Sequence, residues 1–461
     1  MDAFNSGDTA WMLASTALVL LMTPGLALFY GGMVRSKSVL NMMMMSLSSI
    51  GLIGVLWVLY GYSMAFANDV GGGLLGNPFE YFGLSGQFVG NYVATDELPD
   101  VTFPLVGSIP ALVFVAFQAT FAIITVALIS GAVADRMRFG PWLLFGGLWA
   151  TIVYFPVAHW VFSFDGITAE TGGWIANDLK ALDFAGGTAV HINAGAAALA
   201  LAIVIGKRRG WPREPMRPHN LTLVMLGAGL LWFGWFGFNA GSAVGASGIA
   251  GFAMVNTLVA TCGAMLAWLI TERIRDGKPT SLGAASGIVA GLVAITPACA
   301  SVSPLGAVAV GAIAGVLCAL AVGLKFRFGY DDSLDVVGIH LVGGLAGTLL
   351  IGLFADPGSP AAIAGLFYGG GVDQLWRQAV GAFAVLIYSF VVSLVLAYLV
   401  KAMVGLRITE EEESTGIDEV EHAETGYDFS SHRGAGASAP RLGASTTAPA
   451  EPIPATAGKE S

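Results

Sequence analysis

Charge is scarce in this sequence: only 11% of its 461 residues are Asp, Glu, Lys or Arg, whereas a soluble domain carries roughly 25%. Cysteine is also rare, and the three cysteines all fall in or at the ends of apolar segments. Their number and spacing predict neither a disulfide framework nor a metal site. Hydrophobic residues make up 55% of the chain, and the mean hydropathy is +0.73. This composition predicts a polytopic membrane protein, all helical, lying in a lipid bilayer.

The acidity of the chain is local. The formal net charge is −10, but the residues from Ile408 onward hold 11 acids and 3 bases, which leaves −2 for the rest of the chain. Net charge therefore gives no argument for a cationic substrate. Any such argument has to come from the residues inside the membrane.

Long apolar runs recur along the chain, and each can span roughly 30 Å of hydrocarbon. We expect eleven transmembrane helices. The first run has no charged region ahead of it and no small-residue cleavage site, so we expect a retained helix rather than a signal peptide. The runs cover about 10–33, 39–66, 106–134, 141–160, 188–206, 221–240, 249–270, 281–299, 304–325, 335–354 and 376–404.

Basic residues predict the orientation of these helices. The loops that would share one side of the membrane hold 16 Lys and Arg residues, whereas the opposite side has Lys180 and Arg377. Because cytoplasmic loops carry the excess of basic residues, we expect the N-terminus outside and the C-terminus in the cytoplasm.

Two apolar segments begin with an acid, a glycine and a histidine. Asp183 precedes His191, and Asp335 precedes His340, 149 residues after His191. An ionisable side chain inside a membrane is costly and usually functional, although a buried histidine satisfied by a nearby carbonyl is the plainer alternative. The two segments would start from opposite sides of the membrane. This arrangement predicts an inverted five-plus-five repeat with a site between its halves, and one extra helix.

Aromatic residues follow one face of two other segments. Phe114, Phe117 and Phe121 are spaced by three and four residues, and the same spacing relates Trp235, Phe238 and Ser242. Such a stripe is often simple packing. The alternative is an aromatic constriction, or a π-face that attracts a cation.

Taken together, these motifs closely resemble the ammonium transporter family (Amt/Mep/Rh), and within it the Amt branch. The resemblance covers nearly all of residues 10–427. It rests on Thr23 to Lys37, Phe117 to Phe121, Ala181 to Thr188, Val190 to Asn193, Gly234 to Ser242, Thr296 to Cys299 and Asp335 to His340.

The resemblance implies an eleven-helix protomer in a homotrimer, with one hydrophobic pore per protomer, in the bacterial inner (cytoplasmic) membrane. It implies transport of ammonium or ammonia, with no enzymatic activity, cofactor, metal or nucleic-acid partner. The resemblance implies that His191 and His340 are the pore histidines and that Phe121 and Phe238 form a stacked gate. Phe117 and Ser242 would belong to the outer cation site, with Asp183 as its supporting acid and Trp235 beside it in the pore. Asp335 would be a second acid.

One departure from the family pattern affects the outer site. The family usually has a tryptophan after Ala158 to Val161, and this chain has Phe162; the loop 163–180 that follows is also longer and more acidic than usual. Phenylalanine has a weaker π-face for cations than tryptophan. We therefore expect Phe162 to give a weaker outer site, since Trp160 faces elsewhere on a regular helix.

The chain divides into a transporter domain (1–407), a cytoplasmic regulatory region (408–429) and an Ala/Ser/Thr/Pro-rich tail (430–461) that we expect to be disordered. In bacterial relatives the regulatory region implies control by PII-type signal proteins, although acidic runs are often only solvated tails. Two other functions remain as alternatives. One is an ammonium sensor that signals through the tail, and the other, disfavoured by the few histidines, is a haem or metal enzyme.

Overall fold

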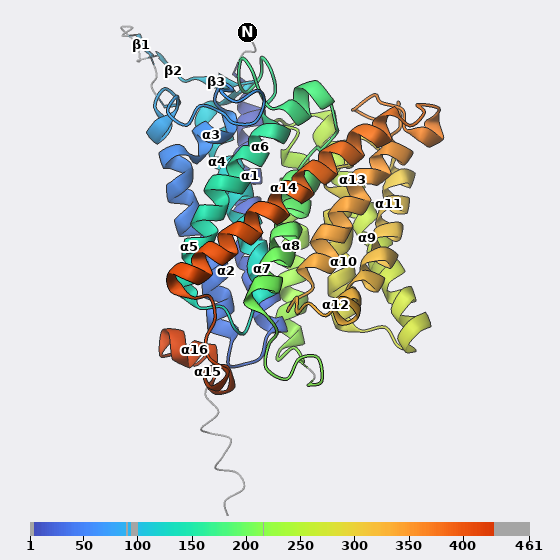
Figure 1. Ribbon diagram of the computed structural model, residues 1–461. Helices are drawn as coiled ribbons and strands as arrows, with labels where there is room; N and C mark the ends of the chain where they lie inside the picture. The colour runs from blue at the N-terminus through green and yellow to red at the C-terminus, as the bar shows by residue number, and fades with distance from the viewer. Residues whose placement is uncertain (1–3, 89–90, 94–99, 215, 428–461) are drawn as a thin grey trace, which may run out of the picture. The chain divides into compact units, whose positions relative to one another are not determined.

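The computed structural model describes residues 4–88, 91–93, 100–214 and 216–427. Helices dominate these residues (Figure 1). In chain order the elements of the first half are α1 (Ser6–Met33), α2 (Val39–Leu56), η1 (Trp57–Gly61), α3 (Tyr62–Phe66), η2 (Phe82–Leu84), β1 (Asn91–Val93), β2 (Asp100–Thr102), β3 (Leu105–Val106), β4 (Ile109–Pro110), α4 (Ala111–Ile129), η3 (Ser130–Val133), α5 (Phe139–Trp149), η4 (Ala150–Tyr154), α6 (Phe155–Phe162), η5 (Ile175–Leu179), η6 (Gly187–Ile192) and α7 (Asn193–Ile205).

The described residues of the second half form helices joined by loops. Its elements are α8 (Leu221–Gly241), α9 (Gly248–Asp276), α10 (Ser281–Ile295), α11 (Pro304–Ala321), α12 (Leu324–Phe328), η7 (Val337–Leu341), α13 (Val342–Phe354), η8 (Leu366–Tyr368), α14 (Asp373–Val404), α15 (Glu410–Thr415) and α16 (Ile417–His422). The four short strands form two antiparallel pairs, β1 with β2 and β3 with β4.

The predicted apolar runs correspond to helices within a few residues. Ten helices in the described part of the chain are long and apolar enough to cross a membrane, which confirms a multi-pass membrane protein. The run predicted at 281–299 is the shorter helix α10, which ends at Ile295 and is followed by a turn. The run predicted from 106 begins later, because the β3–β4 hairpin occupies residues 105–110 before α4.

Close backbone contact joins the two segments that carry the histidines. Each begins as a π-helical turn, η6 or η7, and continues as an α-helix, α7 or α13. A Cβ added to Gly195 of α7 would lie 2.5 Å from the backbone nitrogen of Leu341. Glycine is therefore required where these segments cross, as at other close helix contacts in membranes.

Helix α14 crosses the other helices obliquely, as Figure 1 shows. It packs on α7 and α13, and it contacts α5 near its middle. Ser389 of α14 donates a hydrogen bond to the backbone oxygen of Asn193 (2.8 Å), and Ser393 accepts one from the indole of Trp149 (2.9 Å). The long helix thus fastens the first half of the chain to the second.

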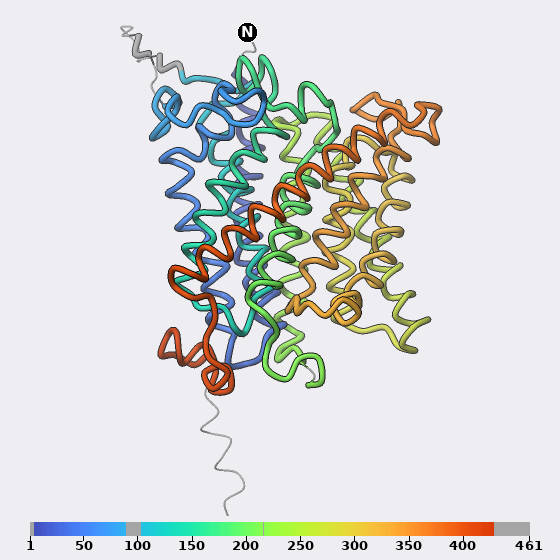
Figure 2. Tube along the Cα trace, viewed as in Figure 1, coloured from blue at the N-terminus to red at the C-terminus, as the bar shows by residue number. Residues whose placement is uncertain are grey.

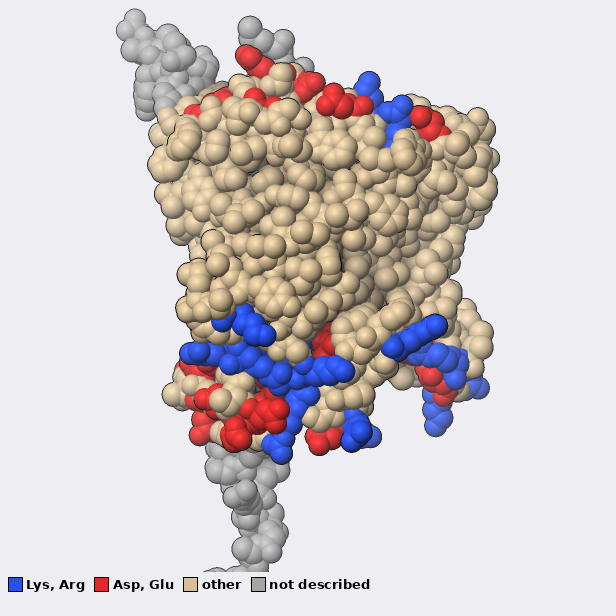
Figure 3. Space-filling view, in the orientation of Figure 1, with Lys and Arg blue, Asp and Glu red and all other residues tan. Residues whose placement is uncertain are grey.

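Charged side chains lie at the two ends of the helices, with a broad uncharged band between them (Figure 3). The tube in Figure 2 shows the start of α1 and the loop 163–186 at one end, and α15 and α16 at the other. Asp418 of α16 accepts hydrogen bonds from the backbone N–H groups of Leu40 (3.0 Å) and Asn41 (2.8 Å). It thereby satisfies free donors in the first turn of α2.

Candidate functional site

Two buried histidines meet at the centre of the helices. The Nδ1 atoms of His191 and His340 are 3.2 Å apart, the ring centroids are 5.3 Å apart, and the side chains are 1% and 3% exposed. In this contact one Nδ1 donates and the other accepts. The Nε2 atom of His191 has no hydrogen-bond partner among the described residues. The pair therefore presents a free imidazole nitrogen to its surroundings.

Asp183 fixes the turn ahead of His191. Its carboxylate accepts hydrogen bonds from the backbone N–H groups of Gly186 (2.8 Å), Gly187 (2.6 Å) and Thr188 (2.8 Å), and from the Thr188 hydroxyl. Gly186 has a φ of 119°, which strongly favours glycine. Burial raises the pKa of Asp183 above its usual value, and the four hydrogen bonds oppose that effect. The Asp183 carboxylate thus uses its hydrogen-bonding capacity to hold the first turn of η6 in place.

Asp332, and not Asp335, takes the position before η7 that Asp183 takes before η6. Asp332 stands eight residues before His340, as Asp183 stands eight before His191. It accepts hydrogen bonds from the backbone N–H groups of Val336 (3.1 Å) and Val337 (2.7 Å). Asp335, which the sequence analysis paired with Asp183, instead forms an ion pair with Lys325 at 2.6 Å. The functional role predicted for Asp335 stays a prediction, whereas the capping position belongs to Asp332, because its carboxylate reaches the first N–H groups of the turn.

Two stacked phenylalanines lie next to the histidines. The rings of Phe121 and Phe238 are 4.1 Å apart with an interplanar angle of 22°. The Phe238 ring is also 6.2 Å from that of His191, and His191 stacks on Trp235 at 5.5 Å. The stacked phenylalanines therefore lie directly next to the histidine pair in space, and Trp235 lies beside His191.

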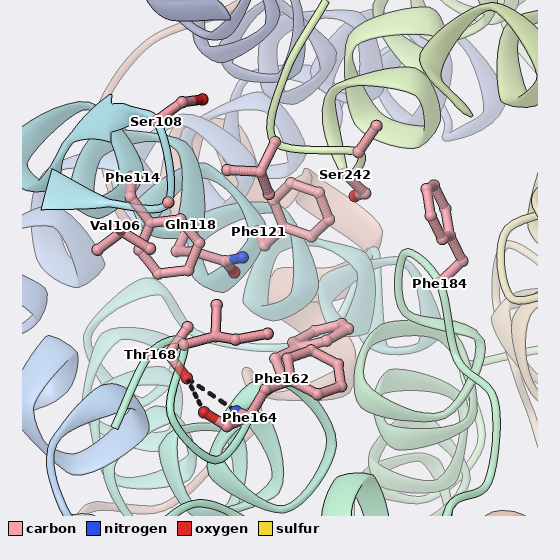
Figure 4. A pocket seen from close by; sticks show the side chains of 14 residues that line it. Val106, Ser108, Phe114, Gln118, Phe121, Phe162, Phe164, Thr168, Phe184 and Ser242 are labelled. Atoms are coloured by element: carbon pink, nitrogen blue, oxygen red, sulfur yellow. Dashed lines mark hydrogen bonds between the residues drawn. The ribbon is translucent and has the colours of Figure 1, made fainter. Parts of the chain in front are cut away.

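A cavity of about 430 Å³ lies beyond the stacked pair, at the end of the molecule where α1 begins, and we name it the outer cavity after the side predicted for that end. Phe121, Phe162 and Ser242 line it, and Figure 4 shows their side chains around the same space. Phe117 does not line this cavity; it is fully buried behind Phe121, with the two rings 4.9 Å apart. The cavity's lining residues are Val106, Gly107, Ser108, Phe114, Gln118, Phe121, Phe162, Phe164, Ile167, Thr168, Phe184, Ser242, Ala243 and Val244.

A separate cavity of only about 10 Å³ lies at the histidines. Apart from the two histidines and Trp235, its walls are apolar: Met22, Leu26, Phe29, Ile124, Leu128, Val190, Leu231, Phe238 and Val289. The face of α1 that supplies Met22, Leu26 and Phe29 continues to Met33, which lines an inner cavity of about 170 Å³. Asp335 and Glu214 also line that inner cavity.

Trp160 points away from the outer cavity, as its position on the helix predicts. Its indole donates a hydrogen bond to the backbone oxygen of Leu74 (2.8 Å), and its ring packs against Tyr388 at 4.8 Å. The neighbouring His159 is a third buried histidine that the sequence analysis did not single out. Its Nδ1 is 3.0 Å from the Ala65 oxygen and its Nε2 is 3.3 Å from Asp69, which ties an outer loop to α6.

Comparisons with known proteins agree on one family. The sequence model of the Ammonium Transporter Family matches residues 10–427. Relatives named ammonium transporter are 68% identical over 438 residues in Mycobacterium tuberculosis, covering 93% of this chain and 92% of the relative. In Corynebacterium glutamicum the identity is 46% over 427 residues, covering 92% of this chain and 90% of the relative.

Solved structures give the same result for the fold. The structure of Saccharomyces cerevisiae Mep2 is 34% identical, with a TM-score of 0.78, and covers 88% of each chain. A sensor Amt protein is 28% identical, with a TM-score of 0.81, over 90% of this chain and 98% of that one.

Proposed function

The chain belongs to the Ammonium Transporter Family, and from this premise we propose that it moves ammonium across the membrane along a pore past His191 and His340. One observation carries the proposal. The outer cavity, the stacked Phe121 and Phe238, the narrow apolar section and the inner cavity follow one another through the molecule. A histidine pair with an unpartnered nitrogen lies in the narrowest part.

Recruitment takes place in the outer cavity in this proposal. Phe121 and Phe162 offer aromatic faces, which attract a cation, and Ser242 offers a hydroxyl oxygen. That oxygen can accept a hydrogen bond from ammonium while its own proton is donated to the backbone oxygen of Phe238 at 2.8 Å. The buried Phe117 acts indirectly, by supporting the ring of Phe121.

Deprotonation follows at the stacked phenylalanines. The free-energy cost of moving a bare cation into an apolar pore is high, whereas the cost for neutral ammonia is much lower. Imidazoles accept and release protons near neutral pH, and the contact between His191 and His340 gives a proton a route from one ring to the other. An imidazole nitrogen of the pair takes the proton from ammonium, ammonia diffuses past, and the pair releases the proton on the far side, where it rejoins ammonia. Potassium has no proton to give up and is excluded.

The finer architecture is proposed on the same premise. We count α10 and the turn after it as a further crossing, which brings the number of crossings to eleven. We place the N-terminus outside because the basic residues gather at the end that holds α15 and α16 (Figure 3). Residues 1–407 then form the transporter domain of a homotrimer in the bacterial inner membrane. Residues 408–429 form a regulatory region that binds a PII-type signal protein, and the tail predicted at 430–461 lies outside the described residues.

An ammonium sensor is the second candidate. The structural likeness to a sensor Amt protein supports it, as do the contacts of the tail. Glu413 of α15 accepts hydrogen bonds from Arg407 (2.8 Å) and from the backbone N–H of Arg209 (3.0 Å). In a sensor, the same outer site would report its occupancy through this tail without sustained flux.

Purified protein in liposomes separates the two functions. Under an inward ammonium gradient, a transporter gives a sustained current or internal pH change that saturates with ammonium concentration. Protein-free liposomes and an equal potassium gradient give the background. The absence of any ammonium-dependent flux from correctly inserted protein would contradict transport and favour the sensor.

A further inference from the structure

The loop that follows α6 places a second phenylalanine at the outer cavity. Phe164 lines this cavity together with Phe162, Phe121 and Ser242, and in Figure 4 its side chain extends into the space from the same segment as Phe162. The two differ in depth, because Phe162 is 7% exposed and Phe164 is 41% exposed. A cation arriving from outside therefore meets the ring of Phe164 before it reaches Phe162.

Phe164 is held in this position by its neighbours. Its backbone N–H donates a hydrogen bond to the Thr168 hydroxyl at 2.8 Å, drawn in Figure 4. On one side, the Ser163 oxygen accepts hydrogen bonds from the Asn177 side chain (2.9 Å) and from the backbone N–H of Gly173 (2.9 Å). On the other side, the backbone N–H of Asp165 donates a hydrogen bond to the side-chain oxygen of Asn177 (3.0 Å). Because the backbone on either side of the ring is already ordered, less conformational entropy is lost when the ring contacts a ligand.

Phe164 also separates two outer cavities. A second cavity of about 400 Å³ is lined by Phe164, Phe184 and Ser242 on the side shared with the first, and by Lys180 elsewhere. Lys180 and Asp183 both line the second cavity, so charges of both signs border it, whereas the described residues that line the first cavity carry no charge. Phe164 and Phe184 therefore border both cavities, and in the uncharged first cavity an aromatic face can attract a cation.

We propose that Phe164 is a cation-recognition residue of the outer site, where its ring supplies the outermost π-face for ammonium and offsets the Phe162 that stands in place of a tryptophan. This inference rests on the proposed function. The physical basis is the attraction of a cation to an aromatic face, which is modest at exposed positions. Its loss corresponds to about a 2- to 5-fold weaker half-saturation.

Phe164→Leu tests the π-face while keeping apolar volume. We expect the half-saturation concentration for ammonium to rise about 2- to 5-fold with maximal flux unchanged, and Phe164→Trp to restore or tighten it. Phe79→Leu is the matched control, because Phe79 is an exposed aromatic (80%) of another outer loop and lines neither outer cavity. Melting temperatures of all variants establish that each is folded.

Three outcomes would overturn the inference: unchanged half-saturation in Phe164→Leu, a fall in maximal flux alone, or an equal effect of Phe79→Leu. A wild-type protein without ammonium-dependent flux would instead refute the proposed function. A double variant adds a further check. If one cation contacts both rings, Phe162→Trp and Phe164→Leu together will change the half-saturation non-additively, since shared partners couple the two sites.

Discussion

A single hydrogen bond between two side chains is the smallest feature on which the proposed mechanism depends. His191 and His340 donate and accept across 3.2 Å inside an apolar section. In the proposed mechanism both rings are neutral between proton transfers, so neither places a permanent charge in the pore. This neutrality is the proposed source of discrimination between ammonium, which can release a proton, and potassium, which cannot.

A fixed negative charge at the histidine pair should therefore admit potassium. We expect His191→Asp to carry potassium currents that the wild type lacks, because a carboxylate stabilises a bare cation where imidazole does not. Potassium-gradient currents in liposomes measure this, with His191→Asn as the uncharged control. Intact potassium exclusion in both His191→Asp and His340→Asp would show that selectivity lies elsewhere.

Phe162 should limit the affinity of the outer site. Phe162→Trp places a stronger π-face in the same cavity, so we expect half-saturation for ammonium or methylammonium to fall about 2- to 5-fold with little change in maximal flux. Trp160→Phe is the control, because that ring faces Tyr388 and not the cavity. If Phe162→Trp leaves affinity unmoved while Trp160→Ala abolishes it, the wrong aromatic has been assigned.

At the scale of elements, each histidine is positioned by an acid that caps a π-helical turn and by a glycine at the crossing. Asp183 and Asp332 take the equivalent positions, each accepting backbone N–H groups at the head of its segment. Both turns place a histidine on the side that faces the other half of the chain. Substitution of a capping acid or of the glycine should therefore lower the stability of the fold more directly than it changes proton transfer at the histidines.

Asp332 should make stability depend on pH. Burial raises its pKa to about 6, with Lys325 opposing and Asp335 reinforcing that effect, whereas an unfolded Asp titrates near 3.9. Between these values the folded protein binds more protons, so this site contributes less stability as pH rises from about 4 to 6, by at most about 3 kcal/mol.

The comparison with Asp332→Asn isolates this effect. The amide does not titrate and imitates the protonated acid, so the melting temperature of the wild type relative to Asp332→Asn should fall as pH rises from 4 to 7. Thermal unfolding in detergent across that range measures the difference. A difference that is flat with pH, or that grows, would contradict the assignment.

Gly195 should be intolerant of any side chain. An added Cβ would meet the backbone of Leu341 at 2.5 Å, and overpacking of this kind costs about 1–3 kcal/mol. Gly195→Ala should therefore lower the melting temperature and reduce flux by separating the histidine segments. Gly229→Ala is the matched control, because nothing lies within 4 Å of a Cβ at Gly229 of α8; equal effects of the two variants would contradict the close-contact argument.

At the scale of the whole molecule, the tail joins segments that are far apart in the sequence. Asp418 caps α2, and Glu421 of α16 forms an ion pair with Arg138 at 3.2 Å. Lys37 donates a hydrogen bond to the backbone oxygen of Ser414. A regulator that binds α15 and α16 would therefore act on residues next to two membrane-spanning helices.

Truncation tests this regulatory region directly. A chain ending at Arg407 should insert and transport but should no longer retain a PII-type protein, whereas a chain ending at Tyr427 keeps α15 and α16 and should retain it. Pull-downs from membranes of cells shocked with ammonium measure the difference. Recovery of no PII-type protein with the full chain would contradict the proposal. Equal recovery with all three chains would place the docking surface outside the regulatory region.

The positions of the apolar helices could be predicted from the sequence alone. Each span carries its own signal, because about twenty consecutive apolar residues are enough to cross the hydrocarbon without help from the rest of the chain. The spacing of Asp183, Gly186 and His191 was likewise visible, since a capping acid and its turn are local in sequence. Family membership, predicted from such motifs, was confirmed over residues 10–427.

Only the tertiary structure decided which side chains meet. The contact of His191 with His340 joins residues 149 positions apart, and no local pattern fixes the distance between them. The same holds for Asp332 in place of Asp335, and for Phe164, whose loop places it at the cavity while Phe117 is covered by Phe121. Hydropathy reports whether a segment lies in lipid, but the direction of each side chain depends on how the packed helices are rotated and crossed, which glycine contacts and capped turns set.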